Sequence, residues 1–211
     1  MLRKYTTILL AAITWFALVL QFFLLLKNGD PQGSSPLRLT VNFFSYFTIL
    51  SNLLVALCTS VAVFRPQGTA GAFLTSAGVR SAVAVYIFIV GLVYNLVLRQ
   101  IWNPTGWQWV VDNLLHVVVP VLYIAWWYFI TPGKQLTWKN IPAWLIFPAI
   151  YLLYSLVRGS LTGWYPYPFV DAATKGYKTV AINAAFVLLA FMLTGAGVVA
   201  LNRARRRDTE R

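Results

Sequence analysis

The sequence predicts an all-α integral membrane protein, in which six transmembrane helices form one bundle and a single domain over residues 1–211. Three observations lead to this prediction. Charged residues make up only 10% of the chain and hydrophobic residues 59%, whereas soluble domains carry roughly 25% charged residues. The apolar residues fall into blocks of about 20, the length that crosses a hydrocarbon core about 30 Å thick. Most charges lie at the ends of these blocks, where a chain meets lipid headgroups.

The first of these blocks raises the question of a signal peptide, because it follows Arg3 and Lys4. Its apolar run of about 20 residues exceeds a signal-peptide core, and no A-x-A cleavage pattern follows. We therefore expect it to be retained as a helix. The predicted spans are residues 6–26, 42–64, 79–98, 110–130, 141–159 and 179–201, followed by a short basic tail at 202–211.

The fifth predicted span is interrupted by Pro142, Pro148 and Arg158. Membrane helices tolerate proline where neighbouring groups satisfy the freed carbonyls, so we keep this span. Among the connections, residues 27–41 and 65–78 are rich in Gly, Pro and Ser and predict flexible loops. The connections 99–109 and 160–178 are instead rich in Trp, Tyr and Pro. Their aromatic residues suit either an interfacial belt that anchors helix ends or direct contact with a ligand.

The distribution of Lys and Arg predicts the orientation. With the N-terminus inside, eleven basic residues lie in inner segments and six in outer ones, which favours both termini in the cytoplasm. The formal net charge of +12 could suggest nucleic acid, but charges placed at the ends of spans fit lipid headgroups instead, so we predict no nucleic-acid partner. The basic tail is either a stop-transfer anchor or a site for anionic lipid.

The chain offers little metal-binding chemistry. It contains one histidine, one cysteine (Cys58) and five acidic residues, whereas first-row metal sites use three or four such ligands. We therefore predict no metal and no cofactor. The single thiol cannot form an internal disulfide, and the oligomeric state is left open.

Polar side chains inside a membrane are energetically costly, so their positions indicate where function is located. The strong hydrogen-bonding residues of the spans all fall in the predicted outer half of the membrane. They are Gln21, Thr48, Asn52, Asn95, Arg99, Asp112, Asn113, His116, Tyr154, Arg158 and Asn183. Each of these alone is readily explained as a polar contact between helices. Their convergence at one depth predicts a water-accessible polar pocket that opens outward, without naming a reaction.

Two of these residues are predicted to lie at the same depth. Thr48 and His116 each lie six residues into an inward-running span, which places both about 9 Å below the outer boundary. Ser45, Thr48 and Asn52 follow helical spacing and predict one polar stripe, as do Asp112 and His116 on the fourth span. We therefore expect Thr48 and His116 to meet across a contact between helices.

Three stretches carry a resemblance to a known family: NFFSYFTILSN around Thr48, DNLLHVVVPVLY around His116, and the late segment GWYPYPF. In this order the chain resembles the androgen-induced-gene and androgen-dependent TFPI-regulating protein family, which has bacterial members, and the likeness covers most of the chain. The family's W-x-Y-P-F stretch corresponds to Trp164, Tyr165, Tyr167, Pro168 and Phe169, with Pro166 as an additional proline.

The resemblance implies an integral membrane threonine hydrolase that cleaves fatty acid esters of hydroxy fatty acids. Carried over residue by residue, it makes Thr48 the nucleophile and His116 the base. A threonine hydroxyl needs an adjacent base to take its proton, and His116 is the only histidine. Loops differ from those of eukaryotic members, which leaves the natural lipid open. The bacterial likeness predicts the bacterial inner membrane as the location and lipid esters and membrane lipids as partners.

Further roles follow as hypotheses. Asn52, Asn95 or Asn183 could donate a hydrogen bond to an oxyanion, and Asp112 either orients the imidazole or lies at the headgroup level. Tyr154, Arg158, Trp164 and Tyr165 are predicted to line an elongated apolar substrate pocket between the second, third and fourth spans. Two other classes stay open: a non-enzymatic membrane scaffold and a small-molecule transporter. Against transport, the inner half lacks strong polar groups and no inverted repeat of broken helices is evident.

Overall fold

The structure is a computed structural model that describes residues 2–30, 33–64 and 68–205. The described residues form helices and no strand. Six of these helical segments are long and apolar enough to cross a membrane, which confirms the predicted number of spans: Arg3–Asn28, Phe47–Phe64, Ala77–Gln100, Gly106–Ile130, Asn140–Thr162 and Ala172–Ala204.

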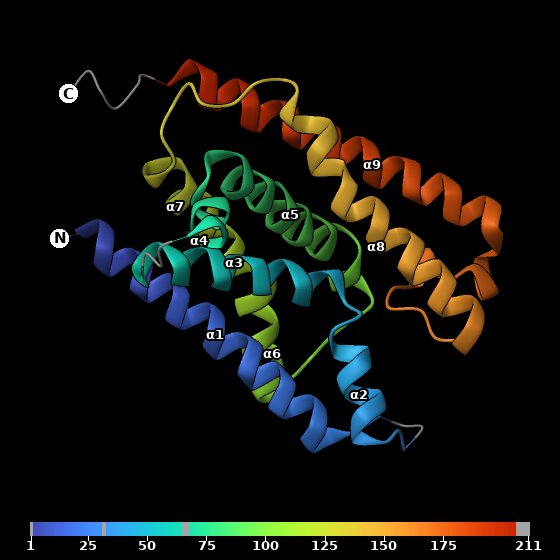
Figure 1. Cartoon of the computed structure of the whole chain (residues 1–211). Coiled ribbons are helices and arrows are strands. Elements are labelled where there is room, and N and C mark those ends of the chain that lie inside the picture. The colour runs from blue at the N-terminus through green and yellow to red at the C-terminus, as the bar shows by residue number, and fades with distance from the viewer. Residues whose placement is uncertain (1, 31–32, 65–67, 206–211) are drawn as a thin grey trace.

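The six spans are built from longer and shorter elements (Figure 1). In chain order they are α1 (Leu2–Asn28), α2 (Pro36–Phe43), α3 (Phe47–Phe64), α4 (Thr69–Thr75), α5 (Ala77–Leu96), η1 (Leu98–Gln100), α6 (Gly106–Asn113), η2 (Leu114–Val118), α7 (Val119–Ile130), α8 (Asn140–Thr162), η3 (Pro168–Val170) and α9 (Ala172–Ala204). Elements α6, η2 and α7 form one continuous span, and η2 within it is a single π-helical turn.

Helix α5 is the centre of the bundle. It packs against α3, α7 and α9, while α1 packs along α3. Over its most apolar window 56% of α5 is buried, compared with 11% for α8 and 17% for α9. Helices α8 and α9 lie side by side at the edge of the bundle (Figure 1). In a membrane, this edge pair would present most of its apolar surface to lipid.

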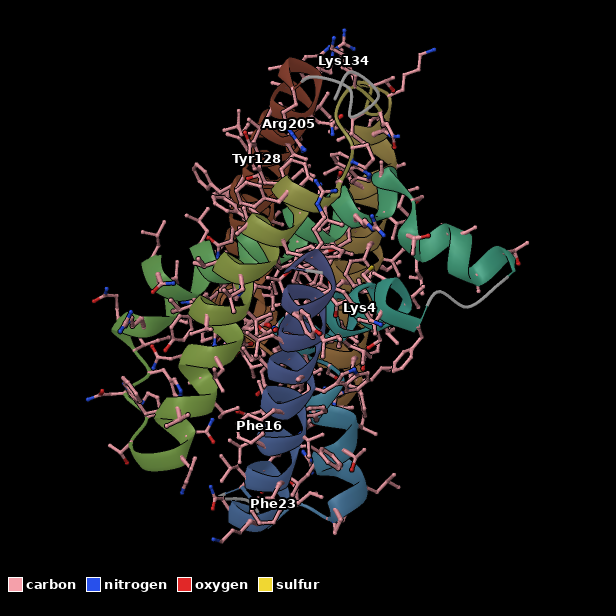
Figure 2. The ribbon with its side chains drawn as sticks, turned by 90° about the vertical axis from the view of Figure 1, so that its left-hand side faces the viewer. Lys4, Phe16, Phe23, Tyr128, Lys134 and Arg205 are labelled. Carbon is pink, nitrogen blue, oxygen red and sulfur yellow. The ribbon has the colours of Figure 1, made fainter. Side chains whose placement is uncertain are left out.

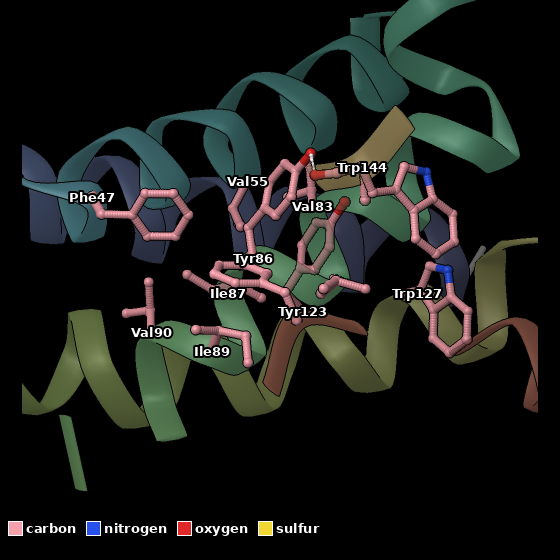
Figure 3. Close-up of a cluster of buried hydrophobic side chains, with 14 of the residues drawn as sticks. Phe47, Val55, Val83, Tyr86, Ile87, Ile89, Val90, Tyr123, Trp127 and Trp144 are labelled. Carbon is pink, nitrogen blue, oxygen red and sulfur yellow. Dashed lines mark hydrogen bonds between the residues drawn. The ribbon is translucent and has the colours of Figure 1, made fainter. Parts of the chain in front are cut away.

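The buried core joins α3, α5, α7 and α8, and its large aromatic residues satisfy their polar atoms inside the protein (Figure 3). The Tyr86 hydroxyl donates to the carbonyl of Trp144 at 2.8 Å, and the Trp127 indole donates to the Ser81 hydroxyl at 2.8 Å. Buried tyrosine and tryptophan need such partners because no water reaches them. These bonds fix how α5 meets α7 and α8.

The second span begins later than predicted. Residues 36–43 form the separate helix α2, whose first turn is capped by Ser35 accepting from the Arg38 amide at 3.3 Å. Ser45 then lies in a turn, so it does not continue the predicted polar stripe on α3. The serine cap and the proline at the first helical position explain why α2 begins at Pro36 as a helix separate from α3. The predicted loop at 27–41 is therefore partly helical, although residues 31–32 lie outside the described residues.

Two other predicted loops also contain helix. Residues 69–75 form α4 within the predicted loop 65–78, of which residues 65–67 are not described. At the opposite end, α8 runs on to Thr162 and stops at Gly163, whose φ of 70° suits glycine. Helix α9 begins with Asp171 accepting from the Ala173 and Thr174 amides, and Gly176 (φ 75°) kinks its first turns. Caps and glycines thus place helix ends inside segments that composition marks as loops.

Candidate active site

Thr48 is the second residue of α3 and is almost fully buried. Its hydroxyl lies 3.2 Å from the Tyr167 hydroxyl, and its amide donates to the same oxygen at 3.1 Å. Tyr167 comes from the segment between α8 and η3, so the contact joins residues 119 positions apart. Burial raises the pKa of Tyr167 to about 12. The phenol therefore stays protonated at neutral pH and can donate a hydrogen bond toward Thr48.

His116 lies in the middle of the π-helical turn η2, with 12% of its side chain exposed. Its Nδ1 is 2.8 Å from the backbone carbonyl of Asp112. A carbonyl can only accept, so Nδ1 carries the proton in the neutral ring and Nε2 keeps its lone pair. Within the described chain, Nε2 has no hydrogen-bond partner. The geometry therefore leaves Nε2 in the form that a general base requires.

Two further groups hold the imidazole. The Tyr94 ring stacks on it with 4.1 Å between ring centroids and an interplanar angle of 16°. The Tyr94 hydroxyl donates to one oxygen of the Asp112 carboxylate, and the other oxygen lies 3.5 Å from His116 Nδ1. Asp112 is thus buried beside the ring, where it can favour the Nδ1–H tautomer. This is the placement that an orienting carboxylate needs.

Thr48 and His116 line one cavity of about 510 Å³. Asp112, Tyr94 and Tyr167 line it too, together with side chains from α1, α6 and η1. Among the described residues, however, no hydrogen bond joins Thr48 to His116. The structure brings the pair to one cavity, and the Tyr167 hydroxyl is the group beside the threonine hydroxyl.

A second, mainly apolar cavity of about 390 Å³ lies on the other side of Thr48. Thr48, Leu98 and Tyr167 line both cavities, so they form the partition between them. The apolar cavity is bounded by α3, α5, α8 and α9. The cavity that Thr48 shares with His116 is therefore the one lined by the second, third and fourth spans, as predicted, together with α1. The apolar cavity is a separate one, closed by α8 and α9.

The three asparagines proposed as oxyanion donors bond to backbone carbonyls instead. Asn52 donates to the carbonyls of Thr48 at 2.9 Å and Leu115 at 3.2 Å. Asn95 donates to Gly91 and accepts from Arg99, and Asn183 donates to Phe169. In the described chain none of them lines either cavity. Their oxyanion role stays a prediction. In the structure these amides pair with main-chain carbonyls, which would be costly to leave unpaired in a bilayer.

Asn52 also explains why Thr48 and His116 converge. Its amide ties α3, one turn below Thr48, to the residue before His116. The equal depth inferred from span starts does not hold, because α3 begins at Phe47 and the fourth span at Gly106. The two side chains reach one cavity through this cross-link and the packing of α1, α3 and η2.

Tyr154, Arg158, Trp164 and Tyr165 form a cluster beside the cavities rather than a pocket lining. The Tyr154 hydroxyl pairs with the Ser45 hydroxyl at 2.7 Å, and Arg158 donates to the Asn42 side chain at 2.6 Å. These contacts fasten the α2–α3 turn to α8. The guanidinium of Arg158 also lies over the Trp164 ring at 4.3 Å.

Tyr165 packs directly on Gly159 of α8, where any larger residue would collide with its ring. Together with the preceding contacts, this places the aromatic segment 164–167 against the end of α8. None of the four residues lines either of the two cavities described above, so their substrate-pocket role stays a prediction.

Two residues of the site were missed from the sequence. Tyr167 lies within the GWYPYPF motif, which was the available signal. Tyr94 directly precedes Asn95 at the depth of the polar layer, but periodicity alone does not distinguish it from the other tyrosines of α5. Only the folded chain shows that Tyr94 stacks on the imidazole.

Comparison with known proteins finds no matching family model, no matching curated protein and no matching solved structure. Within the described residues, no group of three or more His, Cys, Asp or Glu residues could hold a metal ion. The site defined by Thr48, Tyr94, Asp112, His116 and Tyr167 thus has to be interpreted from its own geometry.

Proposed function

We propose that this chain is a membrane-embedded hydrolase of lipid esters, in which Thr48 is the nucleophile and His116 the general base. One observation carries the proposal: Thr48 and His116 line the same cavity. The Nδ1 contact with the Asp112 carbonyl supports it, because it leaves Nε2 free to take a proton. The sequence resemblance to membrane threonine hydrolases supports the same pair.

The reaction proceeds in two steps. The Thr48 Oγ1 adds to the ester carbonyl carbon while its proton passes to His116 Nε2. The departing alcohol takes that proton, and an acyl-Thr48 ester is left. Water deprotonated by His116 then cleaves this ester and releases the fatty acid. A general base reaches its proton directly or through one water, and such contacts tighten when substrate binds.

Negative charge on the reacting oxygens has two sources of stabilisation. The protonated Tyr167 hydroxyl lies 3.2 Å from Thr48 Oγ1 and can donate toward it. Thr48 also lies in the first turn of α3, where the helix dipole favours negative charge. These groups replace the asparagines that the sequence suggested.

The partition at Thr48 suits an ester with a long acyl chain. The apolar cavity between α3, α5, α8 and α9 can hold the chain, while the carbonyl lies at Thr48 and the alcohol portion occupies the cavity with His116. Apolar walls with a few convergent polar groups are typical of small-molecule sites. The substrate class is a carboxylic ester of a fatty acid.

Hydrolysis of a fatty-acyl ester by detergent-purified protein tests the proposal. Thr48→Ala and His116→Ala should each lower the rate by about 10³-fold with little change in thermal stability. Thr59→Ala is the matched control, because Thr59 is a fully buried threonine of the same helix that bonds only to backbone carbonyls. Wild-type rates in both alanine variants would favour a scaffold or a transporter.

The same proposal includes an orientation, with both termini in the cytoplasm of a bacterial cell. The basic-residue distribution supports it, and it places the ester site in the outer half of the inner membrane. A Cys58→Ala background with one added cysteine at Thr69 or Asn103, both exposed, tests it. A membrane-impermeant thiol reagent should label position 103 and not position 69 in intact cells. The reverse pattern would invert the topology.

A further inference from the structure

The charges of the bundle are divided between its two ends. The end where α1 begins and α9 ends, called here the basic end, carries the described cations Arg3, Lys4, Arg80, Lys134, Lys139, Arg203 and Arg205. The described acidic residues all lie toward the opposite end: Asp30 follows α1, Asp112 lies within α6 and Asp171 caps the start of α9. Figure 2 shows Lys134 and Arg205 toward the top of the view, Phe23 at the bottom and Lys4 between them. No described carboxylate is therefore available to neutralise the basic end.

A cavity of about 1100 Å³ opens within this end. It lies between the start of α1, the end of α3, α4 and the start of α5. Arg3, Lys4 and Arg80 supply three positive charges to it, and Val61, Val63 and Ile130 supply part of an apolar wall. We call it the basic cavity. Its lining combines cations with apolar surface, as the headgroup region of a lipid would require.

Arg80 is the cation of this cavity whose side-chain hydrogen-bonding groups lack partners among the described residues. It is partly buried in the first turn of α5, its Nε is buried without a hydrogen-bond partner, and no hydrogen bond of its guanidinium is found within the described chain. The guanidinium lies 5.3 Å from the centroid of the Trp126 ring. A guanidinium has five donors and no acceptor, so leaving it unpaired in a membrane protein is costly unless an anion binds.

The surroundings of Arg80 are held in place independently of any ligand. The Trp126 indole donates to the Thr7 hydroxyl at 2.8 Å, and Thr7 lines the basic cavity. The Tyr123 hydroxyl donates to the Arg80 carbonyl at 3.3 Å. The ring beneath the guanidinium and the backbone that carries it are thus fixed, which reduces the cost of ordering the site when an anion binds.

We infer that the basic cavity binds the phosphate group of an amphiphile, with Arg80 as its principal contact and Arg3 and Lys4 as additional charges. The guanidinium fork matches two phosphate oxygens, and lysine contributes as a point charge. The apolar wall places the glycerol and the first carbons of the chains beside α3 and α7. The same phosphate chemistry could come from a membrane lipid or from a soluble phosphate ester. This inference does not depend on the proposed hydrolase activity.

Native mass spectrometry of the detergent-purified chain, titrated with dioleoyl phosphatidic acid, tests the inference. Arg80→Gln should weaken binding by about tenfold, and Arg3→Gln and Lys4→Gln by roughly threefold each. Lys139→Gln is the matched control, since it removes a cation of the basic end that does not line the basic cavity. It should change binding by less than about twofold. His116→Ala should bind as wild type does, which separates this site from the proposed ester site.

Competition with glycerol 3-phosphate identifies the source of the phosphate. Displacement only at concentrations far above that of the lipid assigns the site to a lipid headgroup, whereas displacement at equal concentration assigns it to a soluble phosphate ester. An equal loss in Lys139→Gln and Arg80→Gln would overturn the inference, because binding would then follow total charge. Absence of binding by both probes would overturn it as well. Should Arg80→Gln not purify as folded protein, the exposed Arg3 and Lys4 variants carry the test.

Discussion

The two ends of the bundle treat their polar groups differently. At the end with Thr48, polar side chains bond to one another across helices: Tyr167 to Thr48, Tyr94 to Asp112, and Arg158 to Asn42. At the basic end, the guanidinium of Arg80 has a ring beneath it and no hydrogen-bond partner in the described chain. Paired groups are held in fixed positions, as the proposed reaction would require, whereas an unpaired cation is able to bind an anion, as we infer for Arg80.

The difference concerns charge and not polarity in general. Asn202, at the basic end, is fully buried and accepts from the amides of Gln135 and Leu136 at 3.1 Å each. It also donates to the Pro132 carbonyl at 2.8 Å. The basic end therefore pairs a buried neutral side chain within the protein, as the opposite end does. What it lacks among the described residues is an anion.

The largest expected effect comes from removing Thr48 and His116 at the end of the bundle opposite the basic end. A Thr48→Ala/His116→Ala double variant should lose about as much activity as either single variant, roughly 10³-fold, because nucleophile and base act as one unit. Rates of ester hydrolysis for the wild type, both single variants and the double variant check this. Losses that multiply would indicate that the two residues act in separate steps.

Removing the hydrogen bonds of Asn202 at the basic end should lower the stability of the protein. Asn202→Ala leaves two amides and one carbonyl of the α7–α8 connection without partners, and we expect a loss of about 2–4 kcal/mol in unfolding free energy. Denaturation in detergent measures it. Asn113→Ala is the control: its amide bonds to one carbonyl in its own helix, so its loss should stay below about 1 kcal/mol.

Tyr167 should make the opposite end sensitive to high pH. Burial raises its pKa to about 12, while an exposed tyrosine in the unfolded chain ionises near 10. The stability associated with this raised pKa is complete below about pH 10 and is lost as pH rises toward 12. The loss amounts to about 2–3 kcal/mol. Tyr167→Phe should flatten this alkaline decline, as seen in melting temperature against pH; an unchanged decline would assign it to other tyrosines.

The smallest expected effect tests how closely the histidine turn must pack. A Cβ at Gly91 of α5 would lie 3.2 Å from the carbonyl oxygen of His116 and 3.4 Å from Pro120. Gly91→Ala should therefore destabilise the protein by about 1–2 kcal/mol and lower hydrolysis through displacement of η2. Gly197→Ala in α9 meets nothing within 4 Å and should be neutral or slightly stabilising. If Gly91→Ala melts at the same temperature as the wild type, η2 can shift to accommodate the added methyl group without loss of stability.

The sequence determined the number and approximate position of the spans, because crossing a bilayer requires about 20 apolar residues whatever the neighbours are. It also determined the separation of charge, since basic residues can be counted segment by segment. The candidate pair was singled out because strong polar groups are rare within apolar blocks and because the family resemblance points to a threonine and a histidine. Each of these properties is local to one segment.

The tertiary structure alone decided what those residues contact. The asparagines looked like free donors in the sequence, but backbone carbonyls of their own and neighbouring helices take their amides. The tautomer of His116 depends on the carbonyl of Asp112, which lies four residues earlier in α6. Tyr167 reaches Thr48 across 119 residues, and the unpaired state of Arg80 reflects which helices surround it. Hydrogen-bond partners are set by packing between segments that are distant in the sequence, so periodicity and composition cannot predict them.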